Sequence, residues 1–345
     1  IDTPFGTVFS SNLTPDNATG IGGWSAAAFR RALHEGRSRD GRLLYPVFPY
    51  THTTLVTPED SDALHAFLRS LPPVTKATPA NTLRFPVNTQ AALAVWRLLY
   101  FDAAWFEPQP GKTAEWNRGA YLARGLAHCS ACHSARDAMG GSVLSQRWGA
   151  GLMPDGHWLA PSLRDITQAG VAEWSVDQVT AFLQNGLNGQ STAMGPMAEV
   201  VFEGTQHLSR EDLQAIAVFL KDLPPQTDQT PAFKPANPEV LALGEKLYGQ
   251  QCADCHGAAG QGAPSAYPAL AGNRSVVMAS HVNAVQAILA GGFAPATAGN
   301  PQPYGMPPFR TLLSDAEIAA VASFVRQSWG NHANPVLPQE VQRLR

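Results

Sequence analysis

The sequence predicts an all-α protein built from three tandem helical units, the first of them incomplete at its N-terminus. Three observations predict this class. The 345 residues exceed one ordinary hydrophobic core, so two or three domains are expected. The 28 prolines and 30 glycines often lie between periodic segments, which is typical of small helical units joined by irregular loops. A capped helix also recurs three times along the chain.

The recurring element is a closing helix that begins after a Ser or Thr N-cap, at Thr57, Ser209 and Ser314. An acidic residue stands three positions after each cap, as in a capping box. In every copy a phenylalanine follows ten positions after the cap and a basic residue twelve positions after it. Equal offsets in three segments indicate an internal repeat.

Two C-x-x-C-H motifs are the most specific feature of the sequence, and they contain all four of its cysteines. Their residues are Cys129, Cys132 and His133, then Cys252, Cys255 and His256. Two thiols at this spacing form thioethers to one haem, and the adjoining His ligates its iron. A thioredoxin-like pair needs a βαβ setting, and a zinc site needs two further ligands at matching spacing; neither is visible near either copy. The sequence therefore predicts two haem c groups.

The motifs and closing helices predict a division into a partial cytochrome c-like unit (1–75), a linker with an amphipathic helix (76–112), a middle unit (113–224), a linker (225–237), a third unit (238–332) and a tail (333–345). The first unit has no C-x-x-C-H. We expect its motif, with a third haem, upstream of Ile1; a decayed domain without haem is the alternative. The tail contains two prolines and is expected to be extended over the surface.

An opening helix is expected just before each motif. It contains a glycine and a tyrosine, Gly119 with Tyr121 in the middle unit and Gly244 with Tyr248 in the third. A small residue and an aromatic ring at these places let the opening helix cross closely against the closing helix and its phenylalanine. That crossing would close a haem crevice.

Methionines supply candidate second axial ligands, which a low-spin electron carrier needs and which raise its potential. Met194 and Met197 lie in an irregular Gly/Pro loop of the middle unit, and the residues alone leave both open. Met197 follows His133 by 64 residues, and Met306 follows His256 by 50. If both irons have His and Met ligands, no position is open for a substrate. The chain is then an electron carrier and not an enzyme on its own.

The matching loop of the first unit has no Met. Phe48 stands where a Met would be expected, and His52 follows a few residues later. His52 is therefore a candidate axial ligand for a haem attached upstream of Ile1, with an ordinary surface His as the alternative.

Charge and hydropathy exclude other classes. The net charge of −3 argues against nucleic-acid binding. The sequence contains no uninterrupted run of about 18 apolar residues, so no membrane-spanning helix is predicted. The nearest candidate, 91–106, is interrupted by Arg97 and Asp102 and is expected to be an amphipathic linker helix. Haem attachment of this kind takes place on the oxidising side of the bacterial membrane, which predicts the periplasm.

Five segments resemble the three-haem cytochrome c subunits of periplasmic, membrane-associated dehydrogenases. They are Thr3–Asp16, Gly20–Ser25, Glu115–Tyr121, Gly195–Val201 and Ser328–Asn331. Such subunits accompany PQQ alcohol dehydrogenases, flavin-dependent sugar and gluconate dehydrogenases, and molybdenum aldehyde or N-heterocycle dehydrogenases. The resemblance implies class I cytochrome c domains with axial pairs His133/Met197 and His256/Met306. It also implies electron relay from a catalytic subunit to ubiquinone or another acceptor at the outer face of the inner membrane.

Within that family, Tyr45–Tyr50 with His52, Pro72–Val74 and Glu115–Arg118 resemble the members that accompany molybdenum hydroxylases, whereas flavin- and PQQ-linked members carry Met where Phe48 stands. The resemblance therefore favours a molybdenum-type partner, with flavin and PQQ types as alternatives. Peripheral membrane association is expected through the partner or a segment outside this sequence. A dihaem peroxidase-like enzyme, which needs a displaceable ligand, and a free soluble shuttle are the alternative functions.

Overall fold

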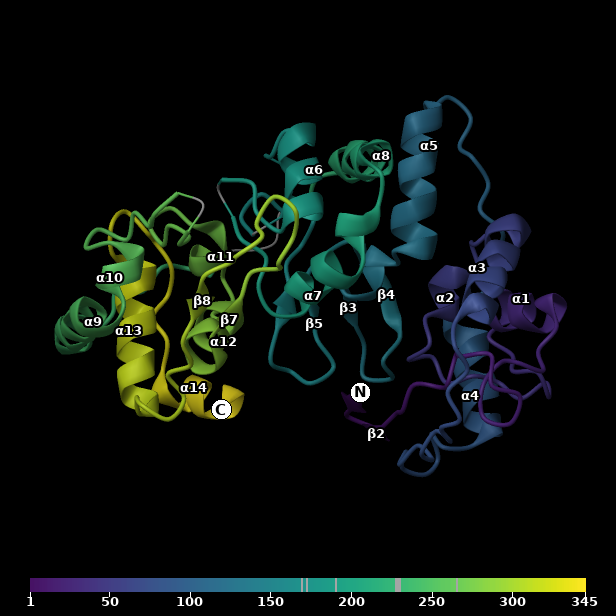
Figure 1. Ribbon diagram of the computed structural model, residues 1–345. Coiled ribbons are helices and arrows are strands. Elements are labelled where there is room, and N and C mark those ends of the chain that lie inside the picture. Colours follow the sequence, from purple (N-terminus) through teal and green to yellow (C-terminus); the bar gives the residue numbers. More distant parts are fainter. Residues whose placement is uncertain (169, 172, 190, 227–230, 265) are drawn as a thin grey trace. The chain divides into compact units, whose positions relative to one another are not determined.

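The computed structural model describes residues 1–168, 170–171, 173–189, 191–226, 231–264 and 266–345 (Figure 1). The chain divides into an N-terminal body, Ile1–Arg147, and a C-terminal body, Trp148–Arg345. The division falls inside the predicted middle unit, so the sequence-based domain borders stay a prediction. Each body is described by itself.

The N-terminal body contains mostly short helices. They are α1 (Ala26–Glu35), α2 (Tyr50–Thr53), α3 (Pro58–Ser70), α4 (Gln90–Tyr100) and α5 (Ala114–Tyr121), followed by a π-helical turn η1 (Leu122–Leu126) and a 3-10 turn η2 (Cys129–Ala131). Two antiparallel hairpins accompany them: β1 (Asp2–Thr3) with β2 (Gly6–Thr7), and β3 (Ser134–Arg136) with β4 (Ser142–Arg147).

The C-terminal body is also helical. Its helices are α6 (Val176–Asn185), α7 (Pro196–Glu203), η3 (Thr205–His207), α8 (Arg210–Lys221), α9 (Pro238–Gln251), α10 (Ala253–His256), α11 (Arg274–Val277), α12 (Val282–Ala290), α13 (Asp315–Gln327) and α14 (Pro338–Leu344). Its hairpins pair β5 (Gly151–Leu152) with β6 (Leu159–Ala160), and β7 (Gly292–Phe293) with β8 (Gly305–Met306). The helix-rich class is confirmed, and the short hairpins are additions that the sequence did not predict.

The three predicted closing helices are α3, α8 and α13. Each begins where its N-cap was predicted, because the hydroxyl of Thr57, Ser209 or Ser314 accepts a hydrogen bond from the backbone N–H three residues on. The reciprocal half of a capping box is present at α13, where the Glu317 carboxylate accepts from the Ser314 N–H at 2.8 Å. The cap thus fixes the start of each repeat.

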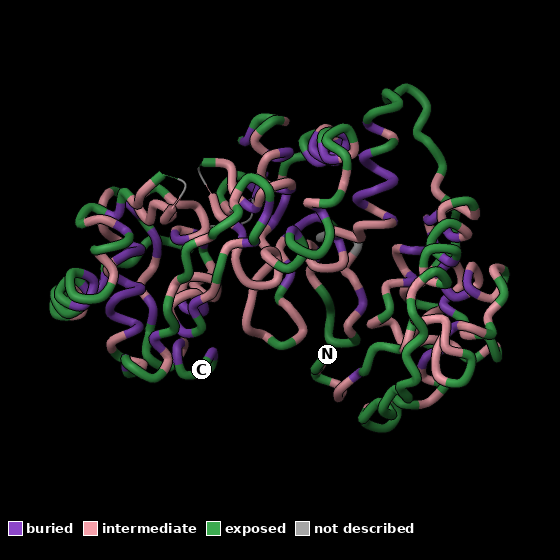
Figure 2. Tube along the Cα trace, in the orientation of Figure 1, coloured by how far each residue is buried: buried purple, intermediate pink, exposed green. Residues whose placement is uncertain are grey.

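The third unit has its core between α9 and α13. A Cβ placed at Gly244 of α9 would lie 2.2 Å from the Ala320 carbonyl oxygen of α13, so only glycine allows this crossing. Next to it, the Tyr248 ring lies 5.5 Å from Phe324 and 4.9 Å from Trp329, between ring centroids. The close crossing predicted for this unit is therefore confirmed, and the inner face of α13 is buried along its length (Figure 2).

The C-terminal tail corrects the sequence analysis. The expectation of an extended tail is wrong, because 338–344 forms α14. Val336, Val341 and Leu344 are buried in the same apolar cluster as α13. The two prolines do not prevent this: Pro338 stands at the first position of α14, where its missing N–H is not needed.

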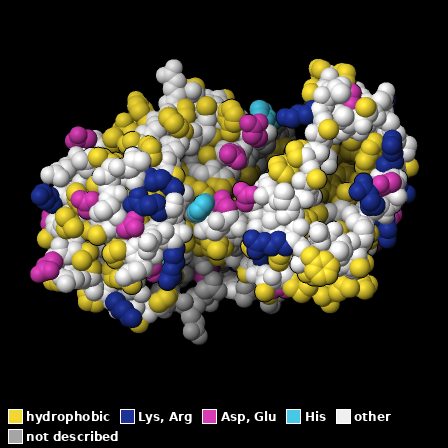
Figure 3. Space-filling model, turned by 90° about the horizontal axis from the view of Figure 1, so that it is seen from below, with side chains coloured by type: hydrophobic (Ala, Val, Ile, Leu, Met, Phe, Trp, Pro, Cys, Tyr) yellow, Lys and Arg dark blue, Asp and Glu magenta, His cyan; other side chains and the backbone are white. Residues whose placement is uncertain are grey.

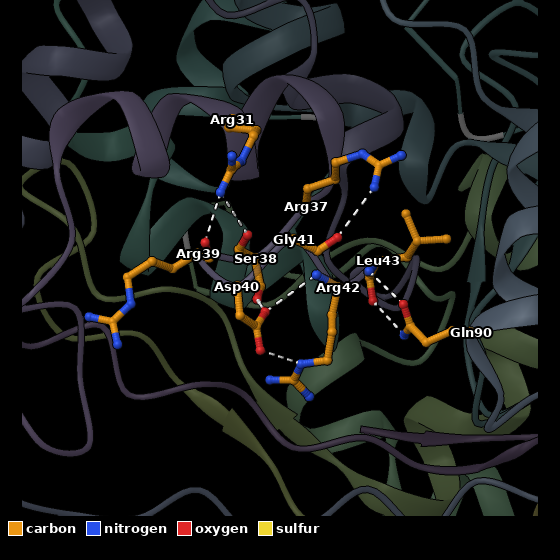
Figure 4. A network of polar contacts seen from close by, with 9 residues as sticks. All are labelled: Arg31, Arg37, Ser38, Arg39, Asp40, Gly41, Arg42, Leu43 and Gln90. Atoms are coloured by element: carbon orange, nitrogen blue, oxygen red, sulfur yellow. Dashed lines mark hydrogen bonds and ion pairs between the residues drawn. The ribbon is translucent and has the colours of Figure 1, made fainter.

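A polar network orders the hairpin-like loop after α1 in the N-terminal body (Figure 4). The side chain of Gln90, the first residue of α4, accepts from the Leu43 N–H at 2.8 Å and donates to its carbonyl at 3.2 Å. Arg31 donates to two loop carbonyls, and Arg42 forms an ion pair with Asp40 at 2.6 Å. These contacts attach the loop to α1 and α4.

Surface charge and helix hydropathy can both be described from the structure. On the face in Figure 3, basic and acidic side chains are interspersed, as the net charge of −3 leads one to expect. Across the described residues, none of the helices combines the length and apolarity that crossing a bilayer takes.

Candidate haem sites

The C-terminal motif is one helical turn that continues α9. Cys252 is the C-cap residue of α9, and the N–H groups of Cys255 and His256 both donate to the Cys252 carbonyl, at 3.2 and 2.9 Å. Residues three apart share a helix face, so this turn sets both thiols on one side. The Tyr248 hydroxyl donates to the Gly257 carbonyl at 2.6 Å and ties the end of the turn to α9.

His256 is held in the protonation state that an iron ligand needs. Its Nδ1 lies 3.0 Å from the Pro268 carbonyl oxygen, which can only accept, so Nδ1 carries the proton and Nε2 keeps its lone pair. The side chain is 9% exposed. Burial lowers the pKa of His256, against the smaller opposite effect of the Pro268 hydrogen bond. The neutral ring is therefore favoured.

The Cys252 thiol stays protonated at neutral pH. Burial, and then the neighbouring Cys255, raise the pKa of Cys252 to about 11. Among the described residues, His, Cys, Asp and Glu side chains do not gather in threes to hold a bare metal ion. The donor set therefore fits thioether attachment beside one imidazole, and it does not fit a zinc-thiolate centre.

A cavity of about 710 Å³ opens over this motif inside the C-terminal body. Cys252, Cys255, His256 and Met306 all line it, together with Tyr267. Its volume lies within the range of roughly 300 to 1,000 Å³ that cofactor sites commonly have. The cavity brings the predicted attachment residues and the predicted ligand pair of the third unit together, so the residues present fit a haem.

Hairpin β7–β8 presents Met306 to this cavity. Met306 pairs with Gly292 in the hairpin, which follows α12 (Figure 1). Gly291 has a φ of 62°, and a Cβ there would lie 2.3 Å from the Met306 carbonyl oxygen. Glycine is therefore required for this close approach. Phe309, which is buried, anchors the strand through its N–H to the Ile288 carbonyl at 3.0 Å.

The middle-unit motif has a different local structure in the N-terminal body. The opening helix α5 passes into the π-helical turn η1, and His128 takes a left-handed conformation with φ 37° just before Cys129. The His133 N–H bonds to the Cys129 carbonyl at 3.0 Å, which again closes one turn around the motif. Burial raises the pKa of Cys129 to about 12.

Tyr121 of this opening helix contacts the first unit. Its hydroxyl donates to the Asp60 carboxylate at 2.5 Å and accepts from the Thr57 N–H at 3.2 Å. These are the N-terminal residues of α3, the closing helix of the first unit. The predicted contact of Tyr121 with the closing helix of its own unit involves α8, which belongs to the other body, and it stays a prediction.

His52 lies beside the middle-unit motif. Its Nε2 is 3.2 Å from the Ser130 hydroxyl and its Nδ1 is 3.0 Å from the Thr51 hydroxyl, so both ring nitrogens have hydroxyl partners. Burial, followed by the nearby His128, Arg147 and Arg136, lowers the pKa of His52 to about 4. Its role as a ligand of a haem upstream of Ile1 stays a prediction.

The two methionine candidates of the middle unit have different surroundings. Met197 is the second residue of α7, in the C-terminal body, whereas His133 belongs to the N-terminal body, so their pairing stays a prediction. Met194 lines the cavity of the third unit. The sequence analysis missed this place for Met194, because no local pattern relates the loop to a cavity formed more than 50 residues later.

Comparisons with known proteins agree on one family. A family model for cytochrome c matches residues 241–329. The cytochrome c subunit of the alcohol dehydrogenase (quinone) of Gluconacetobacter polyoxogenes is 36% identical over 100% of this chain and 77% of its own length. The gluconate 2-dehydrogenase cytochrome c subunit of Pantoea cypripedii is 33% identical, over 99% of this chain and 82% of its own length. A subunit of the nicotinate dehydrogenase of Pseudomonas putida is 40% identical over 94% of this chain, which spans 27% of that longer relative.

The match to the cytochrome c model covers the third unit, and the longer alignments extend the likeness over the remainder of the chain. The motif, the neutral His256 and the cavity are the structural counterpart of that likeness. The chain belongs to the family of the cytochrome c subunits of dehydrogenases.

Proposed function

We propose that the chain relays electrons from the catalytic subunit of a dehydrogenase complex to ubiquinone or another acceptor. Relatives with this alignment are electron-transfer subunits of such complexes and not catalytic subunits. Haem c, when bound, supplies a one-electron couple at its iron. The side chains of this protein attach it, complete its coordination and limit its contact with water.

We assign the attachment and ligand roles by motif. In the third unit Cys252 and Cys255 attach the haem, and His256 and Met306 are its axial ligands. In the middle unit the same roles go to Cys129 and Cys132, and to His133 and Met197. The Pro268 carbonyl keeps the His256 Nε2 free, and the buried Phe309 holds the strand that carries Met306.

The observation that carries the proposal is that His256 and Met306 line the same cavity. A His/Met pair fills both axial positions, so it leaves no coordination site for peroxide or an organic substrate. This favours an electron carrier over a dihaem peroxidase. The thioether also favours the reduced iron and sets a relatively high potential, which suits a carrier that accepts electrons from a dehydrogenase.

The partner is proposed to be a molybdenum-type dehydrogenase located in the periplasm at the outer face of the inner membrane. The likeness to the nicotinate dehydrogenase relative, at 40% identity, supports a partner that oxidises an N-heterocycle or an aldehyde. Flavin and PQQ partners are the alternatives, since the alcohol and gluconate dehydrogenase subunits are 36% and 33% identical. Membrane association would come through the partner or through a segment outside this sequence.

Purification of the native complex tests this proposal. We expect a larger catalytic subunit to co-purify, its cofactor to be molybdenum, and two haems to be attached per chain of this sequence. Substrate of the catalytic subunit should reduce both haems, and added ubiquinone should reoxidise them. A chain that purifies alone and turns over peroxide, with high-spin haem in its resting spectrum, would overturn the proposal. A flavin or PQQ subunit would overturn only the choice of partner.

A further inference from the structure

Met194 reaches the third unit's cavity from the middle unit. It stands in the loop between α6 and α7, three residues before the proposed ligand Met197. Its side chain nevertheless lines the same cavity as Cys252, His256 and Met306, within one compact body. The cavity over the haem motif of the third unit is therefore lined in part by a residue of the predicted middle unit.

The contact of Met194 is with the hairpin that carries Met306. A Cβ placed at Gly292 would lie 3.8 Å from the Met194 methyl group, which is ordinary van der Waals distance. Gly292 is the residue that pairs with Met306 in the hairpin. The Met194 methyl group therefore lies beside the strand residue that pairs with Met306.

Neighbouring contacts hold the Met194 loop in this place. The Thr297 hydroxyl donates to the Asn185 carbonyl at 3.2 Å, and a Cβ at Gly186 would lie 2.1 Å from the Pro295 ring. These contacts join the end of α6 to the segment that follows β7. Because Asn185 and Gly186 lead into the loop, the position of Met194 follows from a tight junction.

A second set of contacts joins other residues of the middle segment to α11 and α12. Arg274, at the start of α11, donates to the Gly170 carbonyl at 2.8 Å and forms an ion pair with Glu173 at 3.3 Å. Asn283 exchanges two hydrogen bonds with Leu159, both at 2.8 Å. The middle segment is thus attached along both α11 and α12.

We propose that Met194 completes the haem site of the third unit, as a side chain that packs on the bound haem and does not ligate an iron. This inference rests on the proposed haem sites. Met306 already offers a thioether to the cavity, and one haem has one axial position opposite His256. A flexible, polarisable Met side chain packs well against an aromatic surface and keeps water away from it. Met194 is therefore a positioning residue that raises the potential of this haem by excluding solvent.

The holoprotein with Met194→Leu and Met194→Gln tests the inference, with Met197→Leu and Met306→Leu as ligand references. The charge-transfer band of thioether-ligated ferric haem counts Met–iron bonds. We expect M194L to keep the full band, and M197L and M306L each to lose about half of it. In a redox titration M194Q should lower one of the two midpoint potentials, the one that M306L also changes, because a polar side chain and water stabilise the ferric charge.

Leu312→Gln is the matched control, since Leu312 is 62% exposed in the same unit and such a change leaves the cavity intact. L312Q should keep both potentials. Loss of band intensity in M194L would show that Met194 is a ligand, and unchanged potentials in M194Q would show that it does not contact the haem. Either result overturns the inference. A full band in M197L or M306L would instead overturn the ligands of the proposed function.

Discussion

The crossing of α9 and α13 gives a sharp test of the third unit, through Gly244→Ala. A Cβ at this position would lie 2.2 Å from the Ala320 carbonyl oxygen and 2.7 Å from the Phe324 Cβ, so the helices must separate by about 1 Å to accept it. Overpacking of this kind costs about 1 to 3 kcal/mol, and the better helix propensity of alanine returns up to about 1 kcal/mol. We expect a net loss of about 1 kcal/mol in the free energy of unfolding.

The same helix provides the control. Gly249 of α9 is exposed, and a Cβ there would meet no atom of the described structure within 4 Å. Gly249→Ala should therefore gain about 0.5 to 1 kcal/mol from helix propensity alone. The two substitutions are chemically identical, so their difference isolates the crossing from the intrinsic preference of the helix.

Urea denaturation of the holoprotein, followed by circular dichroism and by the thioether charge-transfer band, measures both effects. The band should weaken in G244A before the helices unfold, because α9 leads directly into Cys252 and its displacement moves the motif relative to Met306. It should stay unchanged in G249A. Equal unfolding midpoints for the two variants, or a G244A protein more stable than wild type, would refute the crossing.

Two further predictions concern the side chains of Arg326 and His52. Arg326 is 1% exposed and donates to the carbonyls of Val276, Met278 and Asn334 at 2.6 to 2.9 Å. Arg326→Met leaves these carbonyls without their donor and should lower the free energy of unfolding in urea by about 3 kcal/mol. A variant as stable as wild type would contradict this. The pKa of His52, lowered to about 4 mainly by burial, means that the unfolded chain takes up a proton first as the pH falls below 6.5. The free energy of unfolding should therefore decrease as the pH is lowered. Between pH 7 and pH 5 the wild type should lose roughly 2 kcal/mol more of it than His52→Gln. Equal losses in the two proteins would contradict this pKa.

Local patterns predicted the parts of the structure that depend on neighbouring residues. The three N-caps follow from a hydroxyl and the N–H three residues on, which is decided within one turn of helix. The motif of the third unit forms one turn for the same reason. The role of Gly244 in the helix crossing was also predictable. A glycine in the middle of a helix, one turn before Tyr248, does not form a turn, so close packing against another helix is the reason for it.

Contacts between distant segments were not predictable from such patterns. The tail was expected to be extended because its prolines argue against a continuous helix, but a proline at the first helical position is compatible with α14. Val336, Val341 and Leu344 are buried in the cluster of α13, but three apolar residues in so short a segment did not outweigh its two prolines in the sequence analysis. The place of Met194 depends on the packing of α6 against the segment after β7, which no single stretch of sequence specifies.

Attachment and enclosure of the third unit's haem are therefore encoded in different parts of the chain. Residues 238–332 contain both thiols, His256 and Met306, which are the residues proposed to attach this haem and to ligate its iron. They do not contain Met194 or Trp174, which line the same cavity from the middle unit. Since solvent access is one of the factors that set a redox potential, we expect a third unit without the middle segment to keep its ligation and to have a lower potential. If the proposed role of Met194 holds, the tandem arrangement does more than hold several haems in one chain, because the predicted middle unit supplies part of the surroundings of the next haem.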